Sequence, residues 1–231
     1  KFKIKAFFFI YSSALTSKPD LLEIYRHFRH NFFDSIDSFY KEFFASLPAN
    51  KRKKLDKYFT SNKKTISNSM NKFQFYSEND VKFRIVRDNY LTKSEYKSVM
   101  LKMFKKKRFK FKNIKDKIFL QKKDVIKLHK LGHEIGLHSH SHPTDLKKLN
   151  FKKQYNEYKK NNLILKKLLK INKIKSMSHP CGSYNSNTLK ILKTLNIDIG
   201  FKQIMNNKET NSSKYEICRQ DHSNIIRSLE R

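Results

Sequence analysis

The stretch GHEIGLHSHSHP, residues 132–143, decides the fold because it places a short strand directly after a helix. An apolar periodicity over about 122–131 predicts the helix, and Gly132 suits the left-handed position that ends one. The residues EIGLH, 134–138, then predict a buried strand. The same alternation continues along the chain, with helices expected at about 150–170 and 186–195 and strands near 173–178 and 197–201.

Strands and helices that alternate in this way predict right-handed crossovers and a parallel sheet, either open or closed into a barrel. The run FKIKAFFFIY, 2–11, is typical of a strand buried on both faces of such a sheet. The polar stretch 49–80 predicts an excursion from the core with one short helix, and Thr92 with Glu95 predicts a capping box at the start of a later helix. A chain of 231 residues is expected to form one domain.

The formal net charge of +32 does not point to nucleic acid, because lysines are scattered through every segment instead of forming one stripe. Two cysteines, Cys181 and Cys218, cannot build a disulfide framework. The sequence contains no CxxC pair of the kind that would indicate a structural zinc site. The apolar run 6–11 is far too short to cross a bilayer. These features favour a reduced, cytoplasmic location, while the oligomeric state stays open.

Three histidines at every second position follow the strand that ends at His138. Imidazole nitrogen is a good ligand for zinc and similar divalent ions. If the segment stays extended, His138, His140 and His142 share one face. If it turns into a helical loop, His138 and His142 converge and His140 points elsewhere.

Two further segments follow expected strands. In SMSHPCGSYN, 176–185, a proline and a glycine define a tight loop whose backbone amides can line an anion or oxyanion site. In EICRQDHSN, 216–224, an Asp beside a His can supply an acid and its orienting partner, and an Arg can hold a carboxylate. Because active sites of parallel α/β folds lie at the carboxyl ends of strands, all three segments are candidates for one site.

Together these segments resemble the polysaccharide deacetylases of carbohydrate esterase family 4, the NodB-homology domain. His138-Ser139-His140-Ser141-His142 is similar to the family's H-[ST]-x-x-H metal motif, and SHPCGSYN, 178–185, is similar to its R-x-P-x-G loop. The resemblance implies a distorted (β/α) barrel in a single domain, 1–231, with a helical and polar insertion at about 30–110. KFKIKAFFFI, 1–10, resembles the strand that follows the family's first acidic motif, so the first strand is expected to be missing from this chain.

The resemblance implies that His138 and His142 bind a divalent metal, zinc foremost, which polarises an acetyl carbonyl and activates water. The backbone amide after the loop proline takes the oxyanion-stabilising place, and the His of the last segment is the candidate acid for the leaving group. The predicted substrate residues are Pro180, Cys181 and Gly182, and the predicted catalytic residues are His222, Asp221 and Arg219.

The sequence departs from the family at two places. The acidic motif that supplies the general base and the third metal ligand has no counterpart in the chain and is expected to precede Lys1. Ser178 occupies the place of the loop arginine, for which Arg219 is the expected substitute. With only two clear ligands, we expect weak zinc affinity and negligible turnover.

The leading hypothesis is thus a metal-dependent deacetylase acting on a sugar or nucleotide sugar in surface-glycan or nucleotide-sugar metabolism. A rival is a barrel phosphoesterase or amidohydrolase, in which His138 and His140 would form an HxH ligand pair. A third reading is a degenerate domain that binds glycan without cleaving it.

Overall fold

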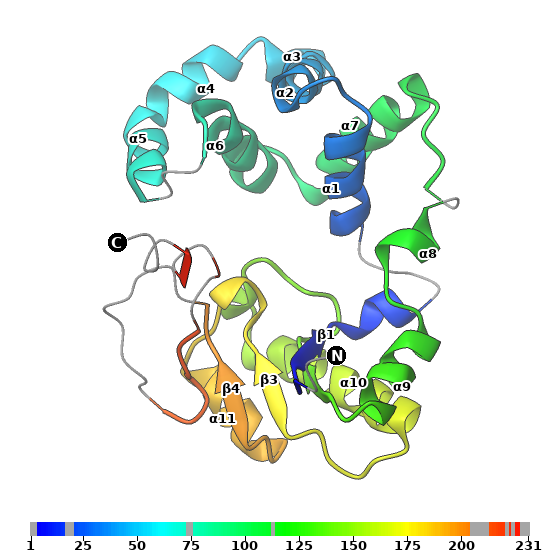
Figure 1. Cartoon of the computed structure of the whole chain (residues 1–231). Coiled ribbons are helices and arrows are strands. Elements are labelled where there is room, and N and C mark those ends of the chain that lie inside the picture. The colour runs from blue at the N-terminus through cyan, green and yellow to red at the C-terminus, as the bar shows by residue number, and fades with distance from the viewer. Residues whose placement is uncertain are drawn as a thin grey trace. The chain divides into compact units, whose positions relative to one another are not determined.

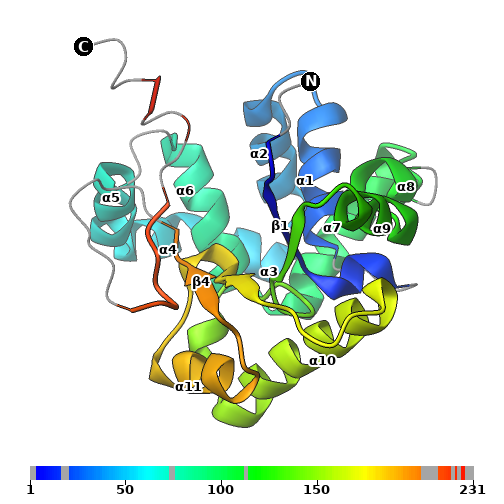
Figure 2. The same cartoon turned by 60° about the horizontal axis from the view of Figure 1, so that its bottom comes forward.

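The computed structural model describes residues 4–16, 21–72, 76–111, 114–203, 213–219, 222 and 225–226. The chain divides into two compact units (Figures 1 and 2). The α/β unit consists of Lys1–Asp20 together with Phe119–Arg231, and the helical unit is Leu21–Ile118.

The α/β unit contains a parallel sheet of four described strands, in the order β1-β2-β3-β4. The register pairs Phe8 with Ile135, Leu137 with Met177, and Ser178 with Phe201. The predicted α/β fold with a parallel sheet is confirmed, while its closure into a barrel stays a prediction. The strands are β1 (Phe7–Ile10), β2 (Glu134–Leu137), β3 (Ser176–Ser178) and β4 (Ile199–Phe201).

The helices of this unit begin and end within a residue or two of the predicted positions. Asn150 caps the longest helix by accepting a hydrogen bond from the Lys153 amide, and Lys170 ends it in the left-handed conformation. Gly132 has φ 84°, as expected of the residue that follows a helix. The α-helices are α9 (Lys122–Lys130), α10 (Phe151–Leu169) and α11 (Ser186–Thr194), and short 3₁₀ turns lie at Ser12–Leu15, Leu146–Lys148 and Pro180–Gly182.

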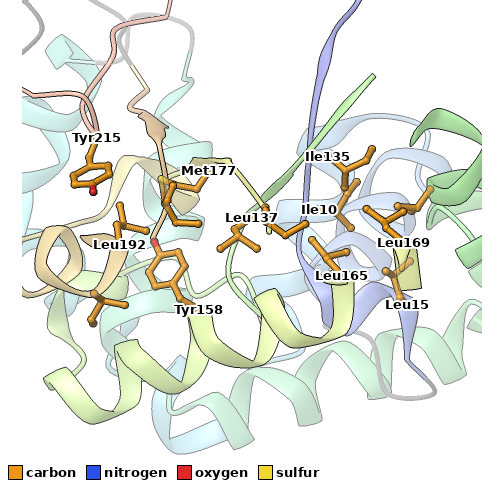
Figure 3. Close-up of a cluster of buried hydrophobic side chains, with 14 of the residues drawn as sticks. Ile10, Leu15, Ile135, Leu137, Tyr158, Leu165, Leu169, Met177, Leu192 and Tyr215 are labelled. Carbon is orange, nitrogen blue, oxygen red and sulfur yellow. The ribbon is translucent and has the colours of Figure 1, made fainter. Parts of the chain in front are cut away.

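One face of the sheet packs on α10 and forms the core of the α/β unit (Figure 3). Alternate strand residues point to this face, as the two-residue period of a strand requires. The helix contributes positions three, four or seven apart, which lie on one side of it. The buried side chains include Ile10, Ile135, Leu137 and Met177 from the strands and Tyr158, Leu165 and Leu169 from α10.

The other face of the sheet carries aromatic rings that meet across two intervening strands. The ring centroids of Phe7 and Phe9 of β1 lie 5.2 and 5.5 Å from that of Phe201 of β4. Three strand spacings in a flat sheet amount to about 14 Å, so the rings must lean together over a curled sheet. Gly136 of β2 makes room for them, because a Cβ there would lie 2.6 Å from the Phe9 ring.

Helices are the regular secondary structure of the described part of the helical unit, and short turns and loops connect them. The capping box of Thr92 and Glu95 is confirmed. The stretch 49–80 lies outside the α/β unit, as an excursion would. The expectation of only one short helix there is wrong, because the described part of the stretch forms three helices and the start of a fourth, and its apolar side chains pack on Val81 and Ile85. The helices are α1 (Leu22–Asn31), α2 (Ile36–Ala45), α3 (Ala49–Arg52), α4 (Leu55–Ser61), α5 (Lys63–Lys72), α6 (Glu78–Ile85) with a π-helical turn (Val86–Tyr90), α7 (Lys93–Lys106) and α8 (Lys115–Ile118).

Within the described residues, no helix combines the length and the apolar character that a membrane span requires.

We predict that Gly136→Ala lowers the free energy of unfolding by about 1–3 kcal/mol, because the added methyl group overpacks the Phe9 ring. Urea denaturation measures the loss. Phe9→Leu in the same chain should recover part of it, giving a coupling energy above about 0.5 kcal/mol in a double-mutant cycle. Strictly additive losses would show that the ring does not limit position 136.

Candidate active site

Three loops meet at one edge of the sheet, because β2, β3 and β4 are parallel neighbours and their carboxyl ends lie together. The loop 138–142 follows β2, and the turn 180–182 follows β3. The segment 213–219 runs beside β4, where Ile217 forms a bridge with Phe201. The first two segments that the sequence singles out, and the described residues 216–219 of the third, therefore lie on one edge.

The loop after β2 turns immediately and brings two of its histidines together. Ser139 and His142 have φ values of 62° and 54°, in the left-handed region. The chain consequently leaves the extended conformation, and the ring centroids of His138 and His142 lie 4.8 Å apart. The segment is neither extended nor helical, but His138 and His142 converge as the second of the two predicted geometries requires.

His140 points away from this pair. Its Nδ1 lies 2.9 Å from the Ser12 hydroxyl, in the 3₁₀ turn after β1. Its backbone amide and that of Ser141 donate to the Glu157 carboxylate at 3.0 and 2.7 Å, and the Ser141 hydroxyl donates to the same carboxylate at 2.8 Å. One acidic residue of α10 thus holds the middle of the histidine loop.

Asn161, one helical turn after Glu157, ties the loop to the sheet. Its side-chain Oδ1 accepts a hydrogen bond from the His138 amide at 2.9 Å, and its Nδ2 donates to the Ile10 carbonyl at 2.9 Å. The Asn161 side chain is fully buried. A single amide group therefore satisfies backbone groups at the ends of two adjacent strands, β1 and β2.

The hydrogen bonds of His138 define its protonation state. Its Nδ1 lies 2.8 Å from the Ser178 carbonyl oxygen, which can only accept, so Nδ1 carries the proton. Burial, and next the charge of His142, lower the pKa of His138 to about 4. The ring is neutral at pH 7, and its Nε2 keeps a lone pair. A histidine whose second nitrogen donates to a carbonyl is the arrangement typical of metal ligands.

The turn after β3 has the unusual backbone that its sequence predicts. Pro180–Gly182 forms one 3₁₀ turn, in which Cys181 and Gly182 have φ values of 52° and 65°. The Gly182 amide donates to the His179 carbonyl at 3.1 Å, while the Cys181 thiol is exposed. A cysteine with no established partner in the sequence predicts a packing role, and the exposure of Cys181 shows that this prediction is wrong.

His179 fastens this turn to the segment 213–219. Its Nε2 donates to the Tyr215 carbonyl at 2.8 Å, and its ring stacks on Tyr184 at 4.2 Å. The Tyr184 hydroxyl donates to the Glu216 carboxylate at 2.8 Å. Burial lowers the pKa of His179 to about 4, so this ring is also neutral at pH 7. The second and third loops are thereby fixed against each other.

Arg219 lies at the same edge. Its guanidinium carbon is 6.0 Å from the Phe9 ring, on the sheet face that also carries Gly136, and its Nε donates to the Lys202 carbonyl at 3.3 Å. Its charge is among those that lower the pKa of His138. The side chain therefore lies over this face of the sheet, and its role as the substitute arginine stays a prediction.

The remaining predicted residues are placed less fully. His222 is exposed, and Asp221 lies outside the described residues. Within the described part of the chain, no three His, Cys, Asp or Glu side chains are grouped closely enough to hold a metal ion. The described residues thus offer two imidazoles of a metal site and no third ligand.

Sequence reasoning missed Glu157 and Asn161, the two residues that shape the histidine loop. A signal for Asn161 does exist in the sequence. It falls three residues after Tyr158 and four before Leu165, on the apolar stripe of α10. A polar residue on such a stripe must be hydrogen-bonded inside the fold, which marks it as a structural anchor.

Comparison with known proteins finds a matching family model. Residues 88–200 match the family described as polysaccharide deacetylase, which confirms the resemblance given by the sequence motifs. The match contains the histidine loop and the turn at 180–182. No curated protein matches the sequence.

Solved structures with some similarity carry related descriptions. The Streptococcus pyogenes deacetylase PplD, in complex with acetate, is 20% identical, with 64% of this chain and 76% of that chain covered and a TM-score of 0.40. BA3943 of Bacillus anthracis, described as a CE4 family pseudoenzyme, is 19% identical, with 42% of this chain and 35% of that chain covered and a TM-score of 0.31. A BA3943 mutant described as having restored enzymatic activity gives the same identity and TM-score.

We predict that Asn161→Leu lowers the free energy of unfolding by about 2–4 kcal/mol, because the buried His138 amide and Ile10 carbonyl both lose their partner. Denaturation in urea gives the value. Asn162→Leu, at the neighbouring position on the same helix, is the matched control and should cost less. Equal losses at both positions would contradict an anchoring role for Asn161.

The buried histidines predict a pH dependence of stability. The pKa values of His138 and His179 are about 4 in the fold, against about 6.5 in the unfolded chain. The unfolded chain therefore binds protons that the folded one does not. The stabilisation is complete above about pH 6.5 and is lost as the pH falls toward 4.

Urea denaturation in the presence of EDTA, from pH 7.5 to 5, measures this effect. We expect a slope of up to about 1.4 kcal/mol per pH unit for each histidine below pH 6. His179→Phe should reduce the slope by one histidine's share. A free energy of unfolding that stays constant down to pH 5 would contradict the prediction.

Proposed function

Since residues 88–200 match the polysaccharide deacetylase family, we propose that the chain is a metal-dependent hydrolase that removes an N- or O-linked acetyl group from a sugar. A match to this family indicates a carbohydrate deacetylase. The observation that carries the metal dependence is the convergence of His138 and His142, with Nδ1 of His138 held by the Ser178 carbonyl. We further propose a sugar or nucleotide sugar of surface-glycan metabolism as the substrate, and zinc as the metal.

The two imidazoles fit part of a divalent metal site. His138 presents a neutral Nε2, and His142 lies beside it in a conformation set by the Ser139 hydroxyl, which accepts from the His142 amide at 3.1 Å. A divalent metal ion bound there supplies Lewis-acid polarisation of the acetyl carbonyl. Glu157 and Asn161 contribute by keeping the two rings in place before the ion arrives.

The other residues have proposed roles in holding substrate and moving protons. The backbone amide of Cys181 is the proposed donor to the oxyanion that forms on the acetyl group, because the left-handed turn after β3 exposes this segment at the sheet edge. His222 is the proposed acid for the leaving group, with Asp221 as its orienting partner. Arg219 is proposed to take the place of the loop arginine that Ser178 replaces.

The helical unit Leu21–Ile118 supports the proposal that one deacetylase-like domain is interrupted by an insertion at about 30–110. This unit has its own buried clusters, as expected of an inserted segment that folds around itself.

A second candidate function is glycan binding without cleavage. It is favoured by the absence of a third ligand among the described residues and by Ser178 in the place of the loop arginine. The HxH rival has less support, because His140 contacts Ser12 and its ring lies away from the His138 and His142 pair.

We predict that zinc titration of the full chain shows weak one-to-one binding that depends on His138 and His142. Alanine at either position should weaken binding about ten-fold or more, because one of two imidazole ligands is lost. His140→Ala and His129→Ala are the controls and should leave the affinity unchanged. A loss of binding in His140→Ala would instead support the HxH pair.

Acetate release from N-acetylglucosamine oligomers, measured with added zinc, tests the reaction itself. Because only two clear metal ligands are present among the described residues, we expect very slow release, which is measured at high protein concentration over a long incubation. Slow release that is abolished by His142→Ala supports the deacetylase. Saturable binding of the oligomer with no acetate release at any zinc concentration would contradict the deacetylase function and support glycan binding without cleavage.

A further inference from the structure

The helical unit contains a small cavity toward which four arginine side chains converge. The cavity has a volume of about 50 Å³ and is bounded by α1, α2, α6, the π-helical turn and α7. The whole sequence has only nine arginines among its 52 basic residues, so nearly half of them lie around one cavity. The four are Arg26 and Arg29 of α1, Arg84 of α6 and Arg87 of the π-helical turn.

These arginines form two like-charged pairs. Arg26 and Arg29 are three residues apart, as are Arg84 and Arg87, so each pair lies on one side of its helix. The guanidinium carbons of Arg29 and Arg87 lie 5.5 and 5.7 Å from the ring centroid of Phe83, although they come from different helices. Like charges at this spacing repel, so stability alone does not account for the arrangement.

Acidic side chains compensate two of the four charges. Arg26 pairs with Glu23 at 3.1 Å, and Arg87 pairs with Asp88 at 2.7 Å. In the described part of the chain, Arg29 and Arg84 have no ion pair.

The two uncompensated guanidinium groups also contain buried donors. The Nε atoms of Arg29 and Arg84 are both buried and have no hydrogen-bond acceptor among the described residues. Burial and the charge of Arg84 lower the pKa of Arg29, while Tyr40 and Asp80 act in the opposite direction. Asp80 is engaged by the Tyr40 hydroxyl, which donates to its carboxylate. Buried cationic donors without an acceptor are costly, and an anion in the cavity would satisfy them.

We propose that this cavity binds a phosphate group. Guanidinium groups present parallel N–H donors that match phosphate oxygens, and the two guanidinium groups that form no ion pair with a described residue supply positive charge for the anion. A volume of about 50 Å³ holds roughly three or four waters, which suits one phosphate group, so a sugar attached to that phosphate would have to lie outside the cavity. The π-helical turn that carries Arg87 is a feature often found at functional sites. The site is separate from the histidine loop and does not depend on the proposed function.

Titration calorimetry of the full chain with inorganic phosphate, at constant ionic strength, tests the proposal. We expect saturable one-to-one binding that weakens about ten-fold or more in Arg29→Gln and in Arg84→Gln. Arg52→Gln, an exposed arginine of the same unit outside the cavity, is the matched control and should bind as the wild type does. The absence of saturable binding, or equal weakening in Arg52→Gln, would overturn the proposal.

Thermal denaturation separates loss of binding from loss of folding. Phosphate should raise the melting temperature of the wild type and of Arg52→Gln, and should not raise that of the cavity variants. Arg84→Lys, which keeps the charge and most of the side-chain length, serves if Arg84→Gln does not fold, and it should also lose affinity because it lacks the planar donor pair.

Two further ligands complete the test. Glucosamine 1-phosphate distinguishes a sugar-linked phosphate from the free ion, and sodium acetate distinguishes a phosphate site from a carboxylate site. Glucosamine 1-phosphate that competes with inorganic phosphate indicates a sugar-linked phosphate, whereas binding of inorganic phosphate alone indicates the free ion. Either result supports a phosphate site. Sodium acetate that binds as tightly as phosphate would overturn the assignment in favour of a carboxylate site.

Discussion

The histidine loop depends on one buried amide, the side chain of Asn161. It accepts from the backbone at the end of β2 and donates to the backbone at the end of β1. Both strands end where the chain must leave regular pairing, so these backbone groups would otherwise be buried without partners. Satisfying them from α10 allows the chain to turn directly after His138, and the turn brings the two imidazoles together.

Further hydrogen bonds connect the histidine loop to the loops that follow β3 and β4. Ser178 accepts from His138, and His179, the next residue, donates to Tyr215 on the following segment. Each loop is thus connected to its neighbour through a histidine that is neutral when buried. Neutral rings suit both tasks, because a neutral imidazole has one donor for the fold and one lone pair for a ligand.

The sequence predicts the parts of this structure that follow from local patterns. Helix boundaries at Gly132, Asn150 and Lys170 agree with predicted positions within a residue or two, because caps and apolar periodicity act over a few neighbouring residues. The spacing of the histidines left two geometries open. Long-range partners, Glu157 and Ser12, decide between them, and spacing within the loop contains no information about either.

The stretch 49–80 shows where local patterns fail to predict the fold. Lysines and asparagines dominate this stretch, so its few apolar residues do not form a clear pattern in the sequence. These residues, which include Leu55 and Ile66, are nevertheless buried and suffice to pack short helices together. The arginine cavity likewise joins residues that are almost 60 positions apart, from Arg29 to Arg87. Only the tertiary fold reveals that these charges are neighbours, since each helix by itself shows an ordinary basic face.

The left-handed backbone at Ser139 and His142 has a consequence for how the loop would evolve or be engineered. Non-glycine residues in this conformation raise the energy of the folded state by about 1–2 kcal/mol each. Glycine would relieve that cost, but at position 139 it would remove the hydroxyl that accepts from the His142 amide, and at position 142 it would remove the imidazole itself. The fixed loop conformation therefore lowers the stability of the folded protein. Substitutions selected only for higher stability would be expected to disturb the alignment of the two imidazoles.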